Sequence, residues 1–250
     1  MGKITVVGIG PGSVSEMTPR VKNAILKADI VVGYKTYLSI IKDIIGDKET
    51  LGTGMTGEVE RSKKAIELAA NGKDVAVVSS GDAGVYGMAG LVLELLFEMD
   101  KDNRPKIEIA SGISSVFTAA AILGAPLMND FAVISLSDLL TPWEVVEKRL
   151  NAAAMGDFVI ALYNPKSKSR KDNINIARDI ILKHRGEETP VGIVWNAGRD
   201  GERKVITTLN DFTKEDISMF SIVIIGNSAT YEKEGFMVTP RGYRQKGMFG

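Results

Sequence analysis

The sequence contains no cysteine and a single histidine, His184, among its 250 residues. The absence of cysteine excludes disulfide bonds, zinc–thiolate sites, iron–sulfur clusters and cysteine nucleophiles. The lone histidine is expected in the last turn of a helix, where a positive charge suits the helix dipole, so we do not assign it a catalytic role. The chemistry of this chain must therefore rest on other residue types.

The sequence also lacks a net charge and a long apolar run. It has 31 basic and 31 acidic residues, a balance that indicates neither a nucleic-acid nor a membrane partner. No apolar run approaches the ~20 residues of a membrane-spanning helix. The first residues lead directly into a predicted strand without the apolar segment of a signal peptide, so we expect a cytoplasmic protein.

The chain is organised around residues 75–90, which read VAVVSSGDAGVYGMAG. The apolar residues 75–78 predict a buried strand, and apolar residues from Val85 to Leu96 recur at helical spacing. Ligands of open α/β sheets bind at the carboxyl ends of strands, where the intervening turn lies. Gly81 allows that turn to bend sharply, and Asp82 could accept hydrogen bonds from a ligand or cap the following helix.

Strand, small-residue turn and helix repeat along the first half. Residues 3–12 form a strand with a glycine-rich turn, and residues 106–123 form a strand, a serine-rich turn and an alanine-rich helix. Thr18 and Pro19 have the pattern of an N-cap followed by a first-turn proline. The repeat predicts a largely parallel sheet with helical crossovers. Gly124 to Leu127 interrupts it, so we predict two domains, 1–124 and 125–250.

In the second half, strands are predicted at Phe131–Leu136, Phe158–Leu162 and Val191–Trp195, each followed by polar residues. A basic segment, residues 166–171, follows the second of these strands and is either a solvated loop or a substrate-facing one. Alternating charged and β-branched residues in 203–208 predict an edge or antiparallel strand.

The second half also contains residue patterns typical of helix starts and ends. Thr141, Pro142 and Glu144 fit a capping box with Thr141 as the N-cap. A further helix is predicted over Asn173–His184, with a stop at Arg185 and Gly186.

The polar residues at the strand ends are backbone amides, small hydroxyls and side-chain amides. They include no nucleophile–base pair, no metal-ligand cluster and no phosphate-binding lysine motif. Such residues bind and orient ligands, which suits a reaction whose chemistry is supplied by a cofactor. Methyl transfer from a sulfonium is one such reaction.

Two other functions are alternatives. A nicotinamide-dependent oxidoreductase would need a third glycine where Ser13 stands and an acidic residue after the second strand. Pro11 also removes a backbone donor that a pyrophosphate would use. The other alternative is a non-catalytic module that binds a nucleotide or metabolite.

Four motifs together resemble the tetrapyrrole methylase family. They are GIGPG at 8–12, SSGDAGVYG at 79–87, GISS with the following helix and GAPL at 112–127, and TPRGY at 239–243. Three further segments, VGYKTY at 32–37, ISLSDLLTPW at 134–143 and YNPKSKSR at 163–170, are similar to the members that methylate carbon 17 of precorrin-3B or cobalt-factor III.

The resemblance implies an α/β fold of two α/β domains with a cleft between them, typical of class III S-adenosylmethionine (SAM) methyltransferases. It implies SAM as cofactor, a tetrapyrrole substrate and a homodimer. The implied reaction is methylation of carbon 17 with contraction of the macrocycle, a step of cobalamin and porphyrin biosynthesis. Methylation of a different corrin carbon is the alternative within the family. No metal is implied. The implied cofactor-binding residues are Pro11, Ser80, Gly81, Asp82, Val85, Ser114, Ser115, Tyr163, Asn164, Asn196, Ala197, Thr239 and Pro240. The expected substrate-binding residues are Gly10, Gly12, Tyr34, Lys166 and Arg170.

The sequence departs from this pattern at two positions. Asn129 and Val133 stand where such enzymes usually carry histidine, so any role of those histidines is absent. Ring contraction requires proton movement on the macrocycle, and Asp138, or its neighbour Ser137, follows a strand end where active sites form. We predict these two as catalytic residues. The alternative for Asp138 is a loop carboxylate that supports the next helix N-terminus.

Overall fold

The computed structural model describes residues 1–54, 56–167, 171–243 and 246–248. The chain divides into two compact units, Met1–Ser115 and Val116–Gly250. Among the helices of the described residues, none combines the length and apolar character that crossing a membrane requires.

The first unit contains a five-stranded sheet in the order β3-β2-β4-β1-β5, in which all neighbouring strands are parallel. Nearly every residue of β1 and β4 is buried, because a parallel sheet is covered by helices on both faces. The elements are β1 (Lys3–Gly8), α1 (Pro19–Lys27), β2 (Ile30–Tyr34), α2 (Lys35–Ile40), α3 (Lys42–Ile45), β3 (Glu49–Thr53), α4 (Glu58–Ala70), β4 (Val75–Ser79), α5 (Ala89–Phe97) and β5 (Lys106–Ala110).

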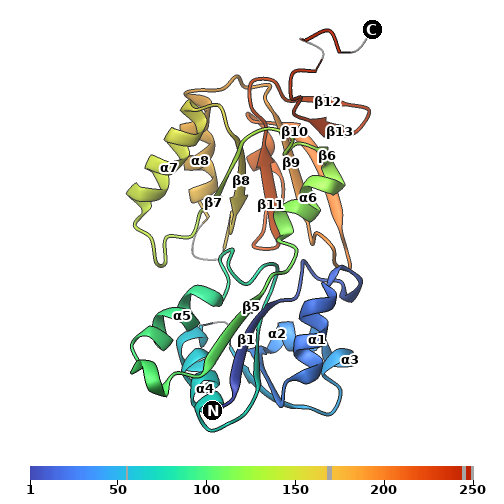
Figure 1. Ribbon diagram of the computed structural model, residues 1–250. Coiled ribbons are helices and arrows are strands. Elements are labelled where there is room, and N and C mark those ends of the chain that lie inside the picture. The colour runs from blue at the N-terminus through green and yellow to red at the C-terminus, as the bar shows by residue number, and fades with distance from the viewer. Residues whose placement is uncertain (55, 168–170, 244–245, 249–250) are drawn as a thin grey trace. The chain divides into compact units, whose positions relative to one another are not determined.

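Alternate residues of the strands pack on opposite faces of this sheet. Helices cover both of these faces (Figure 1). Val75 and Val77 of β4 belong to the core beneath α4 and α5, whereas Ala76 and Val78 belong to the core beneath α1, α2 and α3. The chain leaves β1 through α1 on one face towards β2, and it leaves the adjacent strand β4 through α5 on the other face towards β5. The β1–β4 pair is therefore a topological switch point, where open α/β sheets bind ligands beyond the carboxyl ends of the strands.

The second unit contains a mixed sheet in the order β10-β9-β11-β8-β7. Strands β7 and β8 are parallel, β11 runs antiparallel to β8 and β9, and β10 runs antiparallel to β9. The carboxyl ends of β7, β8 and β9 therefore lie at one edge of this sheet. The elements are α6 (Ser115–Leu123), β6 (Gly124–Ala125), β7 (Phe131–Ser135), α7 (Trp143–Met155), β8 (Val159–Tyr163), α8 (Asn173–Leu182), β9 (Pro190–Trp195), β10 (Arg203–Thr208), β11 (Ser221–Ile225), β12 (Tyr231–Lys233) and β13 (Phe236–Val238).

Helices α7 and α8 pack on one face of the second sheet, and α6 packs on the other (Figure 1). Met237 of β13 joins the core under α6 and is fully buried. Strands β12, β13 and β6 form a small separate sheet, in which β13 runs parallel to β6 and antiparallel to β12.

Several sequence predictions are confirmed. The fold class is α/β, the first sheet is parallel, and β10 is an antiparallel edge strand. Thr18 caps α1, since its hydroxyl accepts a hydrogen bond of 3.3 Å from the Val21 amide. The domain boundary between residues 124 and 125 stays a prediction.

Three helix ends were predicted wrongly. Helix α7 begins at Trp143 with Pro142 as its N-cap, because the backbone of Pro142 is extended, and no side chain caps this end. Helix α5 begins at Ala89 rather than near Val85, because Tyr86 has a φ of 52° that no right-handed helix accommodates. Helix α8 ends at Leu182 rather than at His184.

Candidate functional site

The turns after β1 and β4 are joined through their backbones. The amide of Ile9 donates to the Ser79 carbonyl at 2.9 Å. Gly10 and Gly81 then form an isolated antiparallel bridge, with hydrogen bonds of 3.1 and 2.8 Å in the two directions. The two turns at the switch point therefore form one rigid backbone structure.

Glycines are required in this structure for two different reasons. Gly10 and Gly81 have φ angles of 81° and 62°, which side-chain-bearing residues adopt at a cost. Gly8 and Gly112 have no room for a side chain. A Cβ at Gly8 would lie 2.5 Å from the Gly81 carbonyl oxygen, and one at Gly112 would lie 2.2 Å from the carbonyl oxygens of both Gly8 and Gly81. We call this packed set, Gly8, Gly10, Gly81 and Gly112, the glycine seam.

The carboxylate of Asp82 holds the turn after β5 against the turn after β4. One oxygen accepts a hydrogen bond of 2.8 Å from the Gly84 amide, and the other accepts one of 3.0 Å from the Gly112 amide. Asp82 is not the N-cap of α5, which is Met88. Its side chain therefore stabilises the conformation of two strand-end turns, and contact with a cofactor stays a prediction.

Space for a ligand atom exists next to Gly81. A Cβ built on Gly81 would lie 3.7 Å from the Ser114 Cα and 3.8 Å from the Ser115 nitrogen, which are ordinary contact distances. Main-chain groups of the β4 and β5 turns thus border a volume that a small group can occupy. Three predicted cofactor-binding residues, Gly81, Ser114 and Ser115, therefore lie close together in the first unit.

The other predicted residues of the first unit lie around the same edge. Pro11 is buried and Gly12 half-buried after β1, and Val85 is exposed in the loop before α5. Tyr34 is the last residue of β2, and its ring packs edge-on against Tyr37 with centroids 5.1 Å apart.

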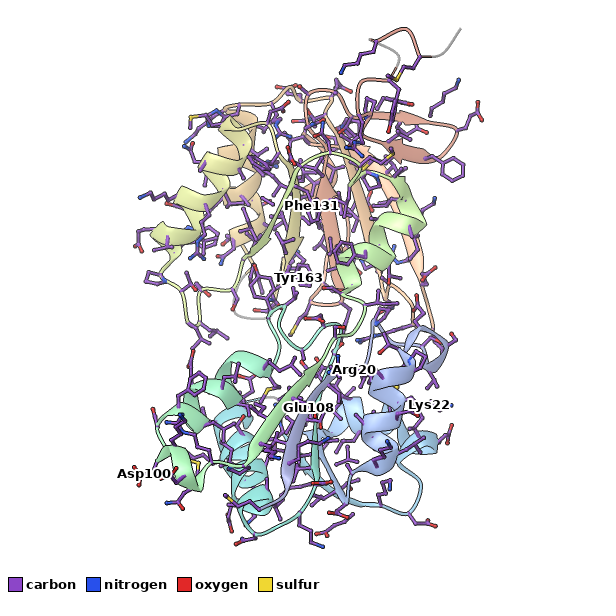
Figure 2. The ribbon with its side chains drawn as sticks, viewed as in Figure 1. Arg20, Lys22, Asp100, Glu108, Phe131 and Tyr163 are labelled. Atoms are coloured by element: carbon purple, nitrogen blue, oxygen red, sulfur yellow. The ribbon has the colours of Figure 1, made fainter. Side chains whose placement is uncertain are left out.

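In the second unit, the turn after β8 is anchored to the end of β7 by side chains. Asn164 has a φ of 50°, and its amide group donates a hydrogen bond of 2.9 Å to the Ser135 hydroxyl. The same hydroxyl accepts a hydrogen bond of 3.2 Å from the Ser137 amide. The Tyr163 hydroxyl, at the end of β8, accepts the amide of Val116 at 3.0 Å, near the start of α6 (Figure 2). Two of the predicted residues, Asn164 and Ser137, are therefore joined through Ser135, and a third, Tyr163, holds the start of α6.

The turn after β9 has the same backbone conformation. Asn196 also has a φ of 50°, and its amide group donates to the Gly201 carbonyl at 3.4 Å. Ala197 follows and is buried. The strand ends in Trp195, whose ring is covered by the Arg203 guanidinium at 3.7 Å from the ring centroid. Asparagine tolerates this left-handed conformation better than most residues, which explains its presence at both strand ends.

The remaining candidates of the second unit are placed less closely together. Thr239 is fully buried, its amide donates to Ala125 and its hydroxyl lies 2.8 Å from the Thr230 hydroxyl. Pro240 and Lys166 are half-buried, and Asp138 is exposed in the loop before α7. Arg170 lies outside the described residues.

Two residues of these edges were not found from the sequence. Ser135 organises the β7 and β8 turns, and its spacing of two from Ser137 at a strand end was the available signal. Arg61 of α4 is buried at the carboxyl end of β3, where it donates to the Thr53 hydroxyl and to the Gly54 carbonyl. Burial lowers the pKa of Arg61, an effect that Glu58 and Tyr37 partly oppose. A buried arginine inside an amphipathic helix gives no sequence signal that separates it from a surface one.

No group of histidine, aspartate and glutamate that could hold a metal ion occurs among the described residues. A hollow of about 410 Å³ in the first unit lies away from the strand-end turns, between α1 and β5, with Arg20 and Glu108 among its lining residues (Figure 2). It contains none of the predicted site residues, and the 3.3 Å ion pair between Lys3 and Glu108 borders it.

Comparison with known proteins gives the family of the chain. Residues 3–213 match the family described as Tetrapyrrole (Corrin/Porphyrin) Methylases. The chain is 51% identical over 240 residues to a probable cobalt-factor III C(17)-methyltransferase of Salmonella typhimurium, covering 96% of this chain and 99% of that protein. It is 49% identical over 247 residues to the cobalt-factor III methyltransferase of Priestia megaterium, covering 98% of this chain and 46% of that protein.

Solved structures show the same fold. The methyltransferase CobJ superposes with a TM-score of 0.90 at 36% identity, over 96% of this chain and all of that one. A cobalt precorrin-4 methyltransferase, CbiF, superposes with a TM-score of 0.71 at 26% identity, over 90% of this chain and 94% of that one.

The chain belongs to the tetrapyrrole methylase family, a class of methyltransferases. Its more specific similarity is to the relatives named for carbon 17 of cobalt-factor III. It spans nearly all of the Salmonella relative but about half the length of the Priestia relative.

Proposed function

We propose that this protein is a SAM-dependent methyltransferase that methylates carbon 17 of cobalt-factor III or precorrin-3B, with contraction of the macrocycle, in cobalamin biosynthesis. The observation that carries the proposal is the 51% identity to a probable cobalt-factor III C(17)-methyltransferase over 99% of that protein. The 0.90 TM-score with CobJ supports it. No observation favours a nicotinamide-dependent oxidoreductase.

The residues of the first unit fit a SAM site. The glycine seam presents main-chain groups rather than side chains, and the space beside Gly81 is bordered by Ser114 and Ser115. Pro11, Ser80, Asp82 and Val85 lie on the same turns. We assign cofactor contact also to residues of the second unit, on the basis of the family resemblance: Tyr163, Asn164, Asn196, Ala197, Thr239 and Pro240.

Bound SAM would supply an electrophilic methyl group that needs no further activation. The residues of this chain then have to bind, orient and exclude water, which is what rigid strand-end turns do well. Gly10, Gly12, Tyr34, Lys166 and Arg170 are proposed to contact the substrate. Asp138, or Ser137 beside it, is proposed to accept or return the proton that moves during ring contraction.

Turnover with purified tetrapyrroles tests the activity directly. We expect methylation of cobalt-factor III or precorrin-3B, and a ¹³C-labelled methyl group located by NMR would identify the modified carbon. Comparison of the cobalt-loaded and metal-free substrates would show which is natural. A label at another corrin carbon would contradict the proposed position and support a different member of the same family.

Cofactor binding is tested by Gly81→Val. The valine must adopt the 62° φ of Gly81 and would fill the space beside Ser114, so we expect S-adenosylhomocysteine binding to be lost while the circular dichroism spectrum is retained. Gly90→Ala is the control, since a Cβ there meets nothing within 4 Å. Unchanged affinity in Gly81→Val would remove this turn from the site.

The role of Asp138 is tested by Asp138→Asn, which keeps the shape of the side chain and removes its charge. We expect normal SAM binding, much less ring-contracted product and accumulation of methylated, uncontracted material. Absorption spectra must accompany mass spectrometry, because contraction can be isomeric. Asp47→Asn, at another exposed loop carboxylate, is the control. A wild-type rate and spectrum in Asp138→Asn would make Asp138 an ordinary loop residue.

We also propose, from the family resemblance, that the protein is a homodimer in the cytoplasm. Analytical ultracentrifugation would test the first part. A species of 26.9 kDa at micromolar concentration would contradict it.

A further inference from the structure

Tyr86 has a backbone conformation that its local sequence does not explain. Five non-glycine residues in the described part of the chain have a positive φ: Tyr86, Asp157, Asn164, Asn196 and Glu234. Asparagine and aspartate are enriched in this conformation. Glu234 occupies the first position of a two-residue hairpin turn between β12 and β13, where a positive φ is required. Tyr86, with a φ of 52°, has neither explanation.

The loop around Tyr86 is closed by a hydrogen bond and is tightly packed at Gly87. The amide of Ala89 donates to the Ala83 carbonyl at 2.9 Å and closes the loop. Gly87 is packed so tightly that a Cβ there would lie 2.5 Å from the Ala83 carbonyl oxygen and 2.6 Å from the Ser79 hydroxyl. Tyr86 is 56% exposed, so burial of its ring does not offset the strain. Strain that the surrounding structure imposes is typical of functional sites.

The position of Tyr86 indicates what the ring contacts. It follows β4, one of the two strands of the switch point, on the same loop as Gly81 and Asp82. Tyr34 and Tyr37 form an edge-on aromatic pair at the end of β2, the strand that pairs with β4. The carboxyl edge of the first unit is therefore rich in aromatic rings next to its backbone-lined turns.

We propose that Tyr86 binds the flat face of the tetrapyrrole substrate and contributes to selection of that substrate, an inference that rests on the proposed function. A partly conjugated macrocycle presents a broad π-face, which an exposed tyrosine ring complements by offset stacking. The enforced backbone conformation fixes the main chain at this exposed residue before the substrate arrives, so little backbone freedom is lost on binding.

Substitution by glycine separates backbone strain from ring contact. Tyr86→Gly permits the positive φ, so we expect its melting temperature to equal or exceed that of the wild type. We expect its affinity for cobalt-factor III, measured by absorption titration, to fall about tenfold. Affinity for S-adenosylhomocysteine should not change. Tyr86→Phe keeps the ring and should bind the tetrapyrrole as the wild type does.

Glu234→Gly is the matched control, because it replaces another residue with a φ near 56° in a hairpin turn. It should leave both affinities unchanged. The proposal is overturned if Tyr86→Gly binds the tetrapyrrole normally, if Tyr86→Phe loses as much affinity as Tyr86→Gly, or if Tyr86→Gly melts below the wild type. Binding needs no turnover, so an inactive wild type that binds cobalt-factor III contradicts the proposed function alone. A wild type that binds neither cobalt-factor III nor precorrin-3B contradicts both.

Discussion

The two units hold their strand-end turns in place by different means. In the first unit, the turns after β1, β4 and β5 are joined by backbone hydrogen bonds and by glycines that pack against carbonyl oxygens. In the second unit, the turn after β8 is held by the side chains of Asn164 and Ser135. The first arrangement has no room for a side chain at Gly8 or Gly112, whereas the second depends on particular hydrogen-bonding groups.

The two units also differ in how they bury an arginine. Arg185 of the second unit pairs with Asp157 at 3.4 Å and donates to the carbonyls of Phe158 and Gly226, at the end of the sheet away from the predicted site residues. Arg61 of the first unit lies at the site edge, and only neutral groups accept its hydrogen bonds. Burial lowers the pKa of both, and only Arg185 has a carboxylate in ion-pair contact. The comparison teaches that the first unit adds close glycine packing to the hydrogen bonds of Asp82, whereas the second depends on polar side-chain partners.

The largest expected effect is that of Gly112→Ala. The new Cβ would lie 2.2 Å from two backbone carbonyl oxygens, so the β1, β4 and β5 turns must separate. We expect a loss of about 3 kcal/mol or more in the free energy of unfolding, measured by urea denaturation. Gly90→Ala in α5 is the control and should be neutral or stabilising. A Gly112→Ala variant as stable as the wild type would show that the turns are not rigid.

Replacement of the buried arginine should cost more stability in the second unit than in the first. Arg185→Met leaves the carbonyls of Phe158 and Gly226 and the carboxylate of Asp157 without their cation, and we expect a cost of about 3 kcal/mol. Arg61→Met loses hydrogen bonds to neutral groups only, so we expect about 1–2 kcal/mol. Urea denaturation of both variants measures the difference. Equal costs would contradict the view that the ion pair distinguishes them.

Asp82→Asn tests how far the first unit depends on a side chain. Asparagine can accept a hydrogen bond from only one of the two backbone amides that donate to Asp82. Its own NH₂ group then faces the other amide. We expect a loss of about 1–3 kcal/mol together with weaker S-adenosylhomocysteine binding. Denaturation and isothermal titration measure the two quantities. Asp100→Asn, at an exposed turn, should change neither.

The smallest expected effect is that of Asn164→Gly. Glycine keeps the positive φ and removes only the hydrogen bond to Ser135, so we expect about 1 kcal/mol of destabilisation. Ser135→Ala removes the same bond and should cost slightly more, because the Ser137 amide also loses its acceptor. If Asn164→Gly stabilised the protein, backbone strain rather than the hydrogen bond would dominate at this turn.

Repeated strand, turn and helix patterns were sufficient to predict the α/β fold. Apolar periodicity, and the turns and helix ends set by proline and glycine, depend only on residues close in the sequence. The same reasoning failed at α5, where the spacing from Val85 to Leu96 fits a helix that the φ of Tyr86 prevents from starting there. It also identified Gly81 and Asp82 as site candidates without revealing that Asp82 binds the Gly112 amide. That contact joins residues 30 positions apart, and it depends on strand order, which composition and spacing do not determine.

The glycine seam has a consequence for how the first unit assembles. Gly8 ends β1, and the other members follow β1, β4 and β5. The pairing of Lys3 with Lys106 brings together residues from the two ends of the unit. Contacts between such distant residues form slowly, because a long stretch of chain must be ordered first. The seam can therefore close only after the last strand of the unit is in place. In hydrogen exchange during refolding, the Gly10, Gly81 and Gly112 amides should gain protection together and after those within α4.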